Sequence, residues 1–208
     1  MGLLSVLSMA HRWIAERVAP GDTVIDATAG NGVDTLFLAE TVGPRGTVIA
    51  FDVQRQALDR TQARLEPLRA AGRLPDVRLV LGSHAGMEDE VPAAKRGRVA
   101  AVMFNLGYLP GADPSVITET ASTLAALEAS MTLLRPGGIV TCVLYPGHEG
   151  GETEAAAVEA WAAGLPPDRG QSAIYRHIQK PAAPYLIAVE KRKPRPADPE
   201  APLPVRQS

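Results

Sequence analysis

The chain has 208 residues with a formal net charge of −2, and 46% of them are hydrophobic and 21% charged. These values predict one globular domain, and no apolar run reaches the ~20 residues that a membrane span needs. The charge excludes a protein that binds nucleic acid through a broadly basic surface. The lone cysteine, Cys142, excludes an internal disulfide and suits a reducing cytoplasm.

Short β-branched runs alternate with longer helical runs along the chain. The apolar start, residues 1–10, has no basic signal-peptide segment, and we expect it to continue into a first helix through residue 18. Strands are expected at 23–27, 47–51, 77–81, 99–104 and 139–145, and helices at 35–41, 54–70, 115–134 and 153–163. Pro67 should end or bend the helix that contains it.

The last two expected strands, 172–178 and 185–190, have no helix between them and should therefore be antiparallel neighbours. The whole pattern predicts an α/β fold: a single doubly wound, Rossmann-like domain over residues 1–193. Its seven-stranded sheet should be mostly parallel, with an antiparallel last strand. Residues 194–208 are rich in proline, alanine and charge, which predicts a disordered tail.

A glycine-rich turn follows the first expected strand. Asp26 ends the strand, and Gly30 and Gly32 then flank Asn31 before a helix begins. A dinucleotide fingerprint would need a third glycine or alanine where Thr35 stands, which counts against NAD. The preceding acid favours a ligand with an ammonium group, such as the methionine part of S-adenosylmethionine. A plain strand-to-helix turn remains the simpler alternative.

Polar residues also follow the next three expected strands. Asp52 ends the second strand about 20 residues after the turn, at the spacing of a carboxylate that accepts hydrogen bonds from ribose hydroxyls. Ser83 and His84 follow the third strand, where an adenine would lie. Asn105 follows the fourth, at the topological switch point, with Tyr108 close behind it. A helix cap, a loop histidine and a packing tyrosine are the simpler alternatives.

Several motifs together resemble one family of class I methyltransferases. They are Asp26–Gly32 with Asp34 and Thr35, Phe51-Asp52 with Gln54, Gly82-Ser83-His84, Phe104–Gly111, Thr118 with Ser122-Thr123, and Tyr145 with Gly147-His148 and Gly151. This combination is similar to the YtqB-type family, known as rRNA methylases and associated with a tRNA wobble-uridine enzyme. The chain departs from the family at Ile178, where the family tends to carry an asparagine.

The resemblance implies an S-adenosylmethionine-dependent enzyme that methylates the amine of 5-aminomethyl-(2-thio)uridine 34 in tRNA. It implies donor contacts from eight residues: Asp26, Gly30, Asn31, Asp34, Asp52, Gln54, Ser83 and His84. Asn105 and Tyr108 are the expected catalytic residues. The expected substrate side adds Leu106, His148, Arg176 and Lys180.

Three alternatives remain open: methylation of rRNA or another nucleobase, a non-catalytic S-adenosylmethionine-binding module, and a nicotinamide dehydrogenase. The expected partner is a tRNA anticodon stem-loop, and no membrane partner or metal is expected because the histidines and cysteine lack metal-ligand spacing. Arg176 and Lys180 precede the last strand on the side of the ligand loops. Lys95 and Arg96 enter the fourth strand from its opposite end and are expected to be solvated surface. The sequence leaves open whether the chain forms a homodimer.

Overall fold

The computed structural model describes residues 2–107, 120–147, 150–180 and 182–193. The strands are β1 (Thr23–Asp26), β2 (Thr47–Asp52), β3 (Asp76–Leu81), β4 (Val99–Leu106), β5 (Leu134–Leu144), β6 (Gly170–Tyr175) and β7 (Tyr185–Lys191). The α-helices are α1 (Val6–Ala15), α2 (Val33–Val42), α3 (Arg55–Ala70), α4 (Met87–Glu90), α5 (Thr120–Leu133) and α6 (Gly151–Ala163). Two 3₁₀ turns, His84–Gly86 and Ala93–Lys95, complete the described elements.

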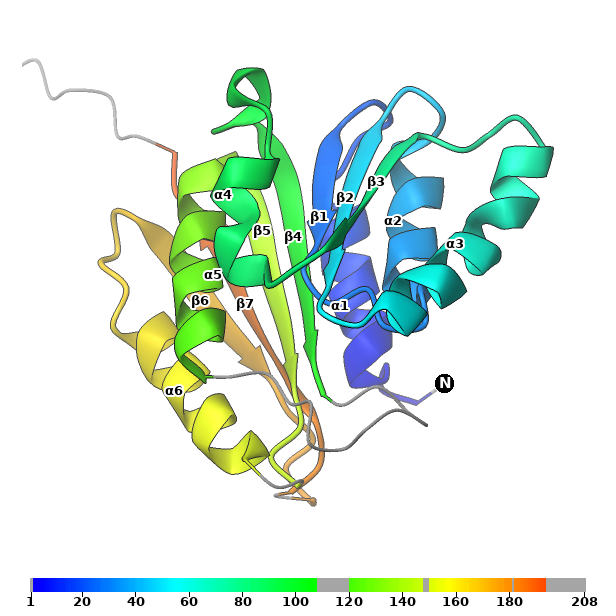
Figure 1. Cartoon of the computed structure of the whole chain (residues 1–208). Helices are drawn as coiled ribbons and strands as arrows, with labels where there is room; N and C mark the ends of the chain where they lie inside the picture. Colours follow the sequence, from blue (N-terminus) through cyan, green and yellow to red (C-terminus); the bar gives the residue numbers. More distant parts are fainter. Residues whose placement is uncertain (1, 108–119, 148–149, 181, 194–208) are drawn as a thin grey trace, which may run out of the picture.

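All seven strands form one sheet in the order β3-β2-β1-β4-β5-β7-β6 (Figure 1). The first five strands pair in parallel. The last strand, β7, is inserted between β5 and β6 and is antiparallel to both. The expected mostly parallel sheet with an antiparallel last strand is therefore confirmed, and the strand order reverses between β1 and β4.

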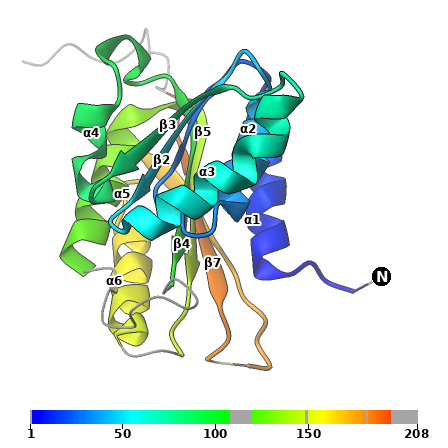
Figure 2. The same ribbon diagram turned by 45° about the vertical axis from the view of Figure 1, so that its right-hand side comes forward.

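Helices cover both faces of the sheet (Figure 2). One buried layer joins α1, α2 and α3 to side chains such as Val24, Val48 and Val143. The other joins α4, α5 and α6 to side chains such as Ile25, Phe104 and Cys142. Because both faces are buried, the central strands are nearly continuous apolar runs without the alternation of a half-exposed sheet. No helix among the described residues is long and apolar enough to cross a membrane.

The expected start of the strand at 139 was wrong. Residues 135–138, which the expected elements leave between the helix and this strand, lie inside β5 as a bulge, because Leu134 still pairs with Val99 before Ile139 pairs with Ala101. Helix α3 does not end at Pro67, and it ends at Ala70, the expected last residue. A proline in the last turn removes one backbone hydrogen bond, whereas the stop comes from Gly72, whose positive φ lets the next residue bond back into the helix.

Other differences are smaller. The short elements between β3 and β4 were not expected, since segments of three or four residues carry no periodic signal. The described part of the long helix expected at 115–134 is α5, and residues 115–119 lie outside the described part of the chain. The expected tail, residues 194–208, also lies outside it.

Candidate active site

The glycine-rich turn between β1 and α2 is fixed by close packing against α3. Gly30 and Gly32 both have positive φ, at 54° and 75°. A Cβ on Gly32 would lie 2.7 Å from the Cα of Thr61 in α3, so no other residue fits without moving backbone. On the same helix, Arg64 donates through Nε to the carbonyl of Asn31 at 2.6 Å. The turn is therefore held in one shape before any ligand arrives.

Asp26 organises this turn from beneath. Its carboxylate accepts hydrogen bonds from the backbone N–H of Thr28, at 3.0 Å, and from the hydroxyl of Thr35, at 2.5 Å. The side chain is fully buried. Burial, reinforced by the nearby carboxylate of Asp34, raises the pKa of Asp26 to about 7. Asp26 therefore has no surface open to a ligand in this conformation, and it acts on the turn through hydrogen bonds and charge.

Asp52 links the ends of β1 and β2. Its Oδ2 accepts from the N–H of Gly30 at 2.9 Å, and its Oδ1 accepts from the N–H of Gln54 at 2.8 Å. Asp52 and Gln54 are both half-buried. Each carboxylate oxygen has a second lone pair, so Asp52 can accept hydrogen bonds from ligand hydroxyls while it holds the turn.

Ser83 and His84 follow β3 but face different surroundings. Ser83 is exposed, and its hydroxyl accepts from the N–H of Ala85 at 3.2 Å. His84 is buried with its ring edge-on to Phe104, and burial lowers its pKa. The ring is therefore neutral at pH 7, and Nδ1 carries the hydrogen that it donates to the carbonyl of Ala27 at 3.0 Å. Within the described chain, the buried Nε2 of His84 has no hydrogen-bond partner.

A second group of polar side chains surrounds Asn105 at the end of β4. The N–H of Asn105 donates to the hydroxyl of Thr28 at 2.7 Å, which joins β4 to the turn after β1. Its Nδ2 donates to Oδ2 of Asp34 at 3.3 Å. The other oxygen of Asp34 lies 2.6 Å from Nε2 of His11 in α1, and the His11 ring stacks on Phe37 with centroids 3.9 Å apart. We call this series of contacts the His11–Asp34–Asn105 chain.

Sequence reasoning gave His11 no role in this group, and it named Tyr145 only within a motif of the family resemblance. The signal for His11 was that the expected first helix carries a histidine, and its contact with Asp34 comes from the packing of α1 on the sheet. Tyr145 follows β5 and hydrogen-bonds to Asn105, and burial raises the pKa of its phenol, which therefore stays protonated. Leu106 is buried in the core. Tyr108 and His148, expected near Asn105, lie outside the described residues.

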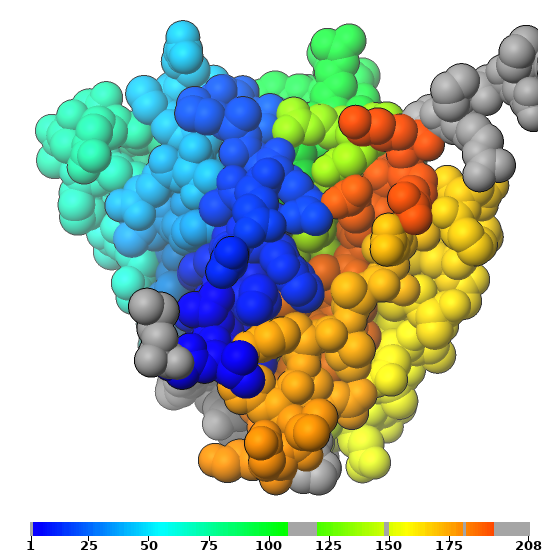
Figure 3. Space-filling view, turned by 180° about the vertical axis from the view of Figure 1, so that it is seen from behind, coloured from blue at the N-terminus to red at the C-terminus, as the bar shows by residue number. Residues whose placement is uncertain are grey.

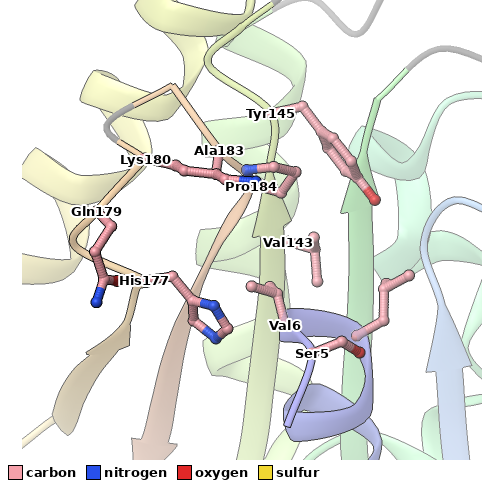
Figure 4. Close-up of a pocket in the computed structure, with 10 residues that line it drawn as sticks. Ser5, Val6, Val143, Tyr145, His177, Gln179, Lys180, Ala183 and Pro184 are labelled. Carbon is pink, nitrogen blue, oxygen red and sulfur yellow. The ribbon is translucent and has the colours of Figure 1, made fainter. Parts of the chain in front are cut away.

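A cavity of about 420 Å³ opens beside Tyr145, between the start of α1 and the connection from β6 to β7 (Figure 4). Its lining comprises Ser5, Val6, Leu7, Val143, Tyr145, His177, Gln179, Lys180, Ala183 and Pro184. This volume falls in the range of ~300–1,000 Å³ that small-molecule sites occupy.

The two cations expected on the substrate side point to different places. Lys180 is exposed and lines the cavity. The guanidinium of Arg176 lies 4.7 Å from the ring centre of Tyr185 and 3.7 Å from a carboxylate oxygen of Glu159, on the α6 side. Lys95, expected as solvated surface, instead donates to the hydroxyl of Thr47 at the amino end of the sheet. Among the described residues, no cluster of side chains could hold a metal ion.

Comparison with known proteins shows the family to which the chain is similar and the cofactor that a relative binds. A family described as "Putative rRNA methylase" matches residues 48–190. A "tRNA (mnm(5)s(2)U34)-methyltransferase, chloroplastic" from Arabidopsis thaliana is 38% identical over 197 residues, which are 92% of this chain and 71% of that protein.

Two solved structures are similar over almost the whole fold. A "putative rRNA-methylase" from Clostridium thermocellum is 37% identical, with a TM-score of 0.85 over 92% of this chain and 100% of the other. A "putative methyltransferase" from Streptococcus mutans, "in complex with SAH", is 32% identical, with a TM-score of 0.79 over 91% of this chain and 99% of the other. The latter binds the demethylated form of the methyl donor.

Proposed function

Because this chain belongs to the rRNA methylase family and is an S-adenosylmethionine-dependent methyltransferase, we propose that its substrate is the wobble uridine of tRNA. The reaction would methylate the amine of 5-aminomethyl-(2-thio)uridine 34 and give the 5-methylaminomethyl form. The observation that carries this proposal is the 38% identity, over 92% of the chain, with a tRNA (mnm(5)s(2)U34)-methyltransferase.

The turn after β1 and the ends of β2 and β3 fit the methyl donor. Asp52 is already oriented by two backbone N–H groups and has lone pairs free for ribose hydroxyls, with Gln54 beside it. Gly30 and Asn31 form the close-packed turn over which the methionine part would lie. Asp34 adds negative charge that favours its ammonium group, Asp26 holds the turn through its hydrogen bonds, and Ser83 and His84 border the adenine. When bound, S-adenosylmethionine supplies an electrophilic methyl group on a sulfonium.

Asn105 is the residue best placed to orient the acceptor amine. A carboxylate only accepts hydrogen bonds, so Asp34 fixes the amide of Asn105 with Nδ2 toward itself. That orientation leaves Oδ1 as an acceptor for an amine hydrogen, and the backbone carbonyl of Leu106 is a second acceptor. An amine held by two acceptors directs its lone pair at the methyl group, which is how positioning accelerates an in-line displacement.

Two further residues belong to the proposal although they lie outside the described part of the chain. Tyr108 would stack on the uracil, and His148 would accept the proton that the methylated amine releases. A displacement by a neutral amine needs no general base in the transfer step itself. Their roles are therefore expected to affect substrate binding and product release.

Methylation of ribosomal RNA is the second candidate, because the family that matches residues 48–190 is described as an rRNA methylase. Nucleoside mass spectrometry of tRNA and rRNA from a strain that lacks the gene distinguishes the two. The proposal expects 5-aminomethyluridine to accumulate in tRNA while rRNA stays unchanged. Loss of a methylated nucleoside from rRNA alone would favour the second candidate. Donor binding without methyl transfer to any RNA would indicate a non-catalytic binding module.

A further inference from the structure

The cavity beside Tyr145 lies one strand away from the proposed position of the acceptor amine. Asn105 on β4 is the register partner of Val143 on β5, and Val143 lines the cavity. Register partners on parallel strands project to the same face, and neighbouring strands lie about 4.8 Å apart. Tyr145 connects the cavity to Asn105, since its ring lines the cavity (Figure 4) and its phenol hydrogen-bonds to Asn105.

Helix α1 also contacts both the cavity and the His11–Asp34–Asn105 chain. Leu7 lines the cavity, and His11, one turn later, holds Asp34 of the His11–Asp34–Asn105 chain. Residues four apart share one face of a helix, so α1 presents both side chains to the sheet together. The segment before α1 is tied to the β6–β7 side of the cavity, because Nε2 of His177, a lining residue, lies 3.2 Å from the carbonyl oxygen of Leu4, which also accepts from the hydroxyl of Tyr175 at 2.8 Å. Figure 3 shows these two segments side by side.

The lining has the chemistry of a site for an unstacked base. Its walls are apolar and aromatic, with Leu7, Val143, Tyr145 and Pro184 among them. Its rim carries the exposed cation of Lys180. An apolar cavity with a cation at its mouth suits a base with its phosphate outside, the arrangement that readers of single strands use.

We propose that this cavity receives the uracil ring of the acceptor nucleotide, with Leu7 and Tyr145 as its walls and Lys180 on the adjacent phosphate. The amine of a 5-aminomethyl group is one carbon away from the ring. An amine at Asn105 therefore puts the ring about one strand spacing away, over Val143. This inference rests on the proposed function, and it gives α1 a part in substrate recognition.

The experiment fills the cavity and leaves the donor site intact. Ala183 is half-buried in the lining, so Ala183→Trp occupies the space; Ala173→Trp, on the exposed side of β6 outside the lining, is the matched control. The substrate is a synthetic tRNA anticodon stem-loop with 5-aminomethyluridine at position 34. Three quantities are measured: kcat/KM for methylation, stem-loop affinity by fluorescence anisotropy, and S-adenosylhomocysteine affinity by calorimetry.

The inference expects Ala183→Trp to lower kcat/KM and stem-loop affinity by about tenfold or more, as loss of a stacked base would. Affinity for S-adenosylhomocysteine should stay at the wild-type value in both variants, and Ala173→Trp should match wild type throughout. Lys180→Gln changes an exposed side chain and cannot disturb packing. It should lower the salt slope of log K for the stem-loop by about 0.7.

Failure of the inference differs from failure of the proposed function. If wild type methylates the stem-loop and Ala183→Trp behaves like Ala173→Trp, the cavity is not the base site, although the proposed function stands. If the wild-type protein does not methylate the stem-loop, the proposed function fails, and the stem-loop affinities measured by fluorescence anisotropy then test the cavity alone. Equal binding by both tryptophan variants and an unchanged slope for Lys180→Gln would then overturn the inference as well.

Discussion

Replacing Gly32 by alanine should destabilise the protein by about 2–5 kcal/mol. A non-glycine residue in the left-handed region costs about 1–2 kcal/mol. The added Cβ would also lie 2.7 Å from the Cα of Thr61, a backbone atom that moves only with helix α3. Overpacking of this kind costs about 1–3 kcal/mol more. The displaced turn would also lose its fit to the donor, so affinity for S-adenosylhomocysteine should fall.

Gly72 provides the matched control. It also has a positive φ, of +64°, it ends the same helix α3, and a Cβ there would meet no atom within 4 Å. Gly72→Ala should therefore cost only the conformational term of about 1–2 kcal/mol and leave donor affinity unchanged. In thermal melts, Gly32→Ala should lose roughly 2–12 °C more than Gly72→Ala. Equal losses, with donor affinity intact in both variants, would refute the close packing of the turn against α3.

Three further predictions concern polar and charged side chains, two in the candidate site and one at the opposite end of the sheet. Asp52→Ala should weaken binding of S-adenosylhomocysteine by about 1.5–3 kcal/mol in calorimetry. Asn105→Ala should leave this affinity nearly unchanged and lower kcat. If Asn105→Ala abolished binding and Asp52→Ala lowered only kcat, the two proposed roles would be exchanged. Because the folded-state pKa of Asp26 is raised to about 7, its contribution to stability is full below pH 4 and is lost as the pH rises to 7, at about 1.4 kcal/mol per unit. Thermal melts should therefore find Asp26→Asn more stable relative to wild type at pH 8 than at pH 5, and a constant difference would contradict the raised pKa. Replacing Lys95 and Arg96 by alanine should leave the salt dependence of tRNA binding unchanged, and a smaller slope would mean that RNA contacts the amino end of the sheet.

The sheet could be predicted from the sequence because its signals are local. β-branched runs, separated by helical runs and glycine turns, predict the strands and their mostly parallel arrangement. The bulge in β5 could not be predicted, because Pro136 and Gly137 read locally as a turn between elements. In the fold, Leu134 precedes that turn and still completes the sheet beside Val99, a pairing that only the neighbouring strand specifies.

Some contacts of the candidate site could likewise be predicted from the sequence, and others could not. Asp52 and Asn105 follow strand ends that meet at one edge of a parallel sheet, so their approach to the turn after β1 follows from topology. His11 joins them through the packing of α1 on the sheet, a contact between segments that are far apart in the chain. Tyr145 follows β5, which pairs with β4, so its contact with Asn105 also follows from the topology of the sheet. The separation of Arg176 from Lys180 has a similar cause, since Tyr185 and Glu159 hold the arginine on the α6 side.

The insertion of β7 between β5 and β6 sets the order in which the protein can mature during synthesis. A nascent chain that ends after β6 already contains β1 to β5 and the whole turn from Asp26 to Gly32, but β6 has no strand to pair with until β7 emerges. The contacts of Leu4 with Tyr175 and of Arg17 with Glu190 join the start of the chain to β6 and β7. The part of the sheet that carries the glycine-rich turn can therefore assemble while translation continues, whereas the β6–β7 side of the cavity forms only after the last strand has left the ribosome.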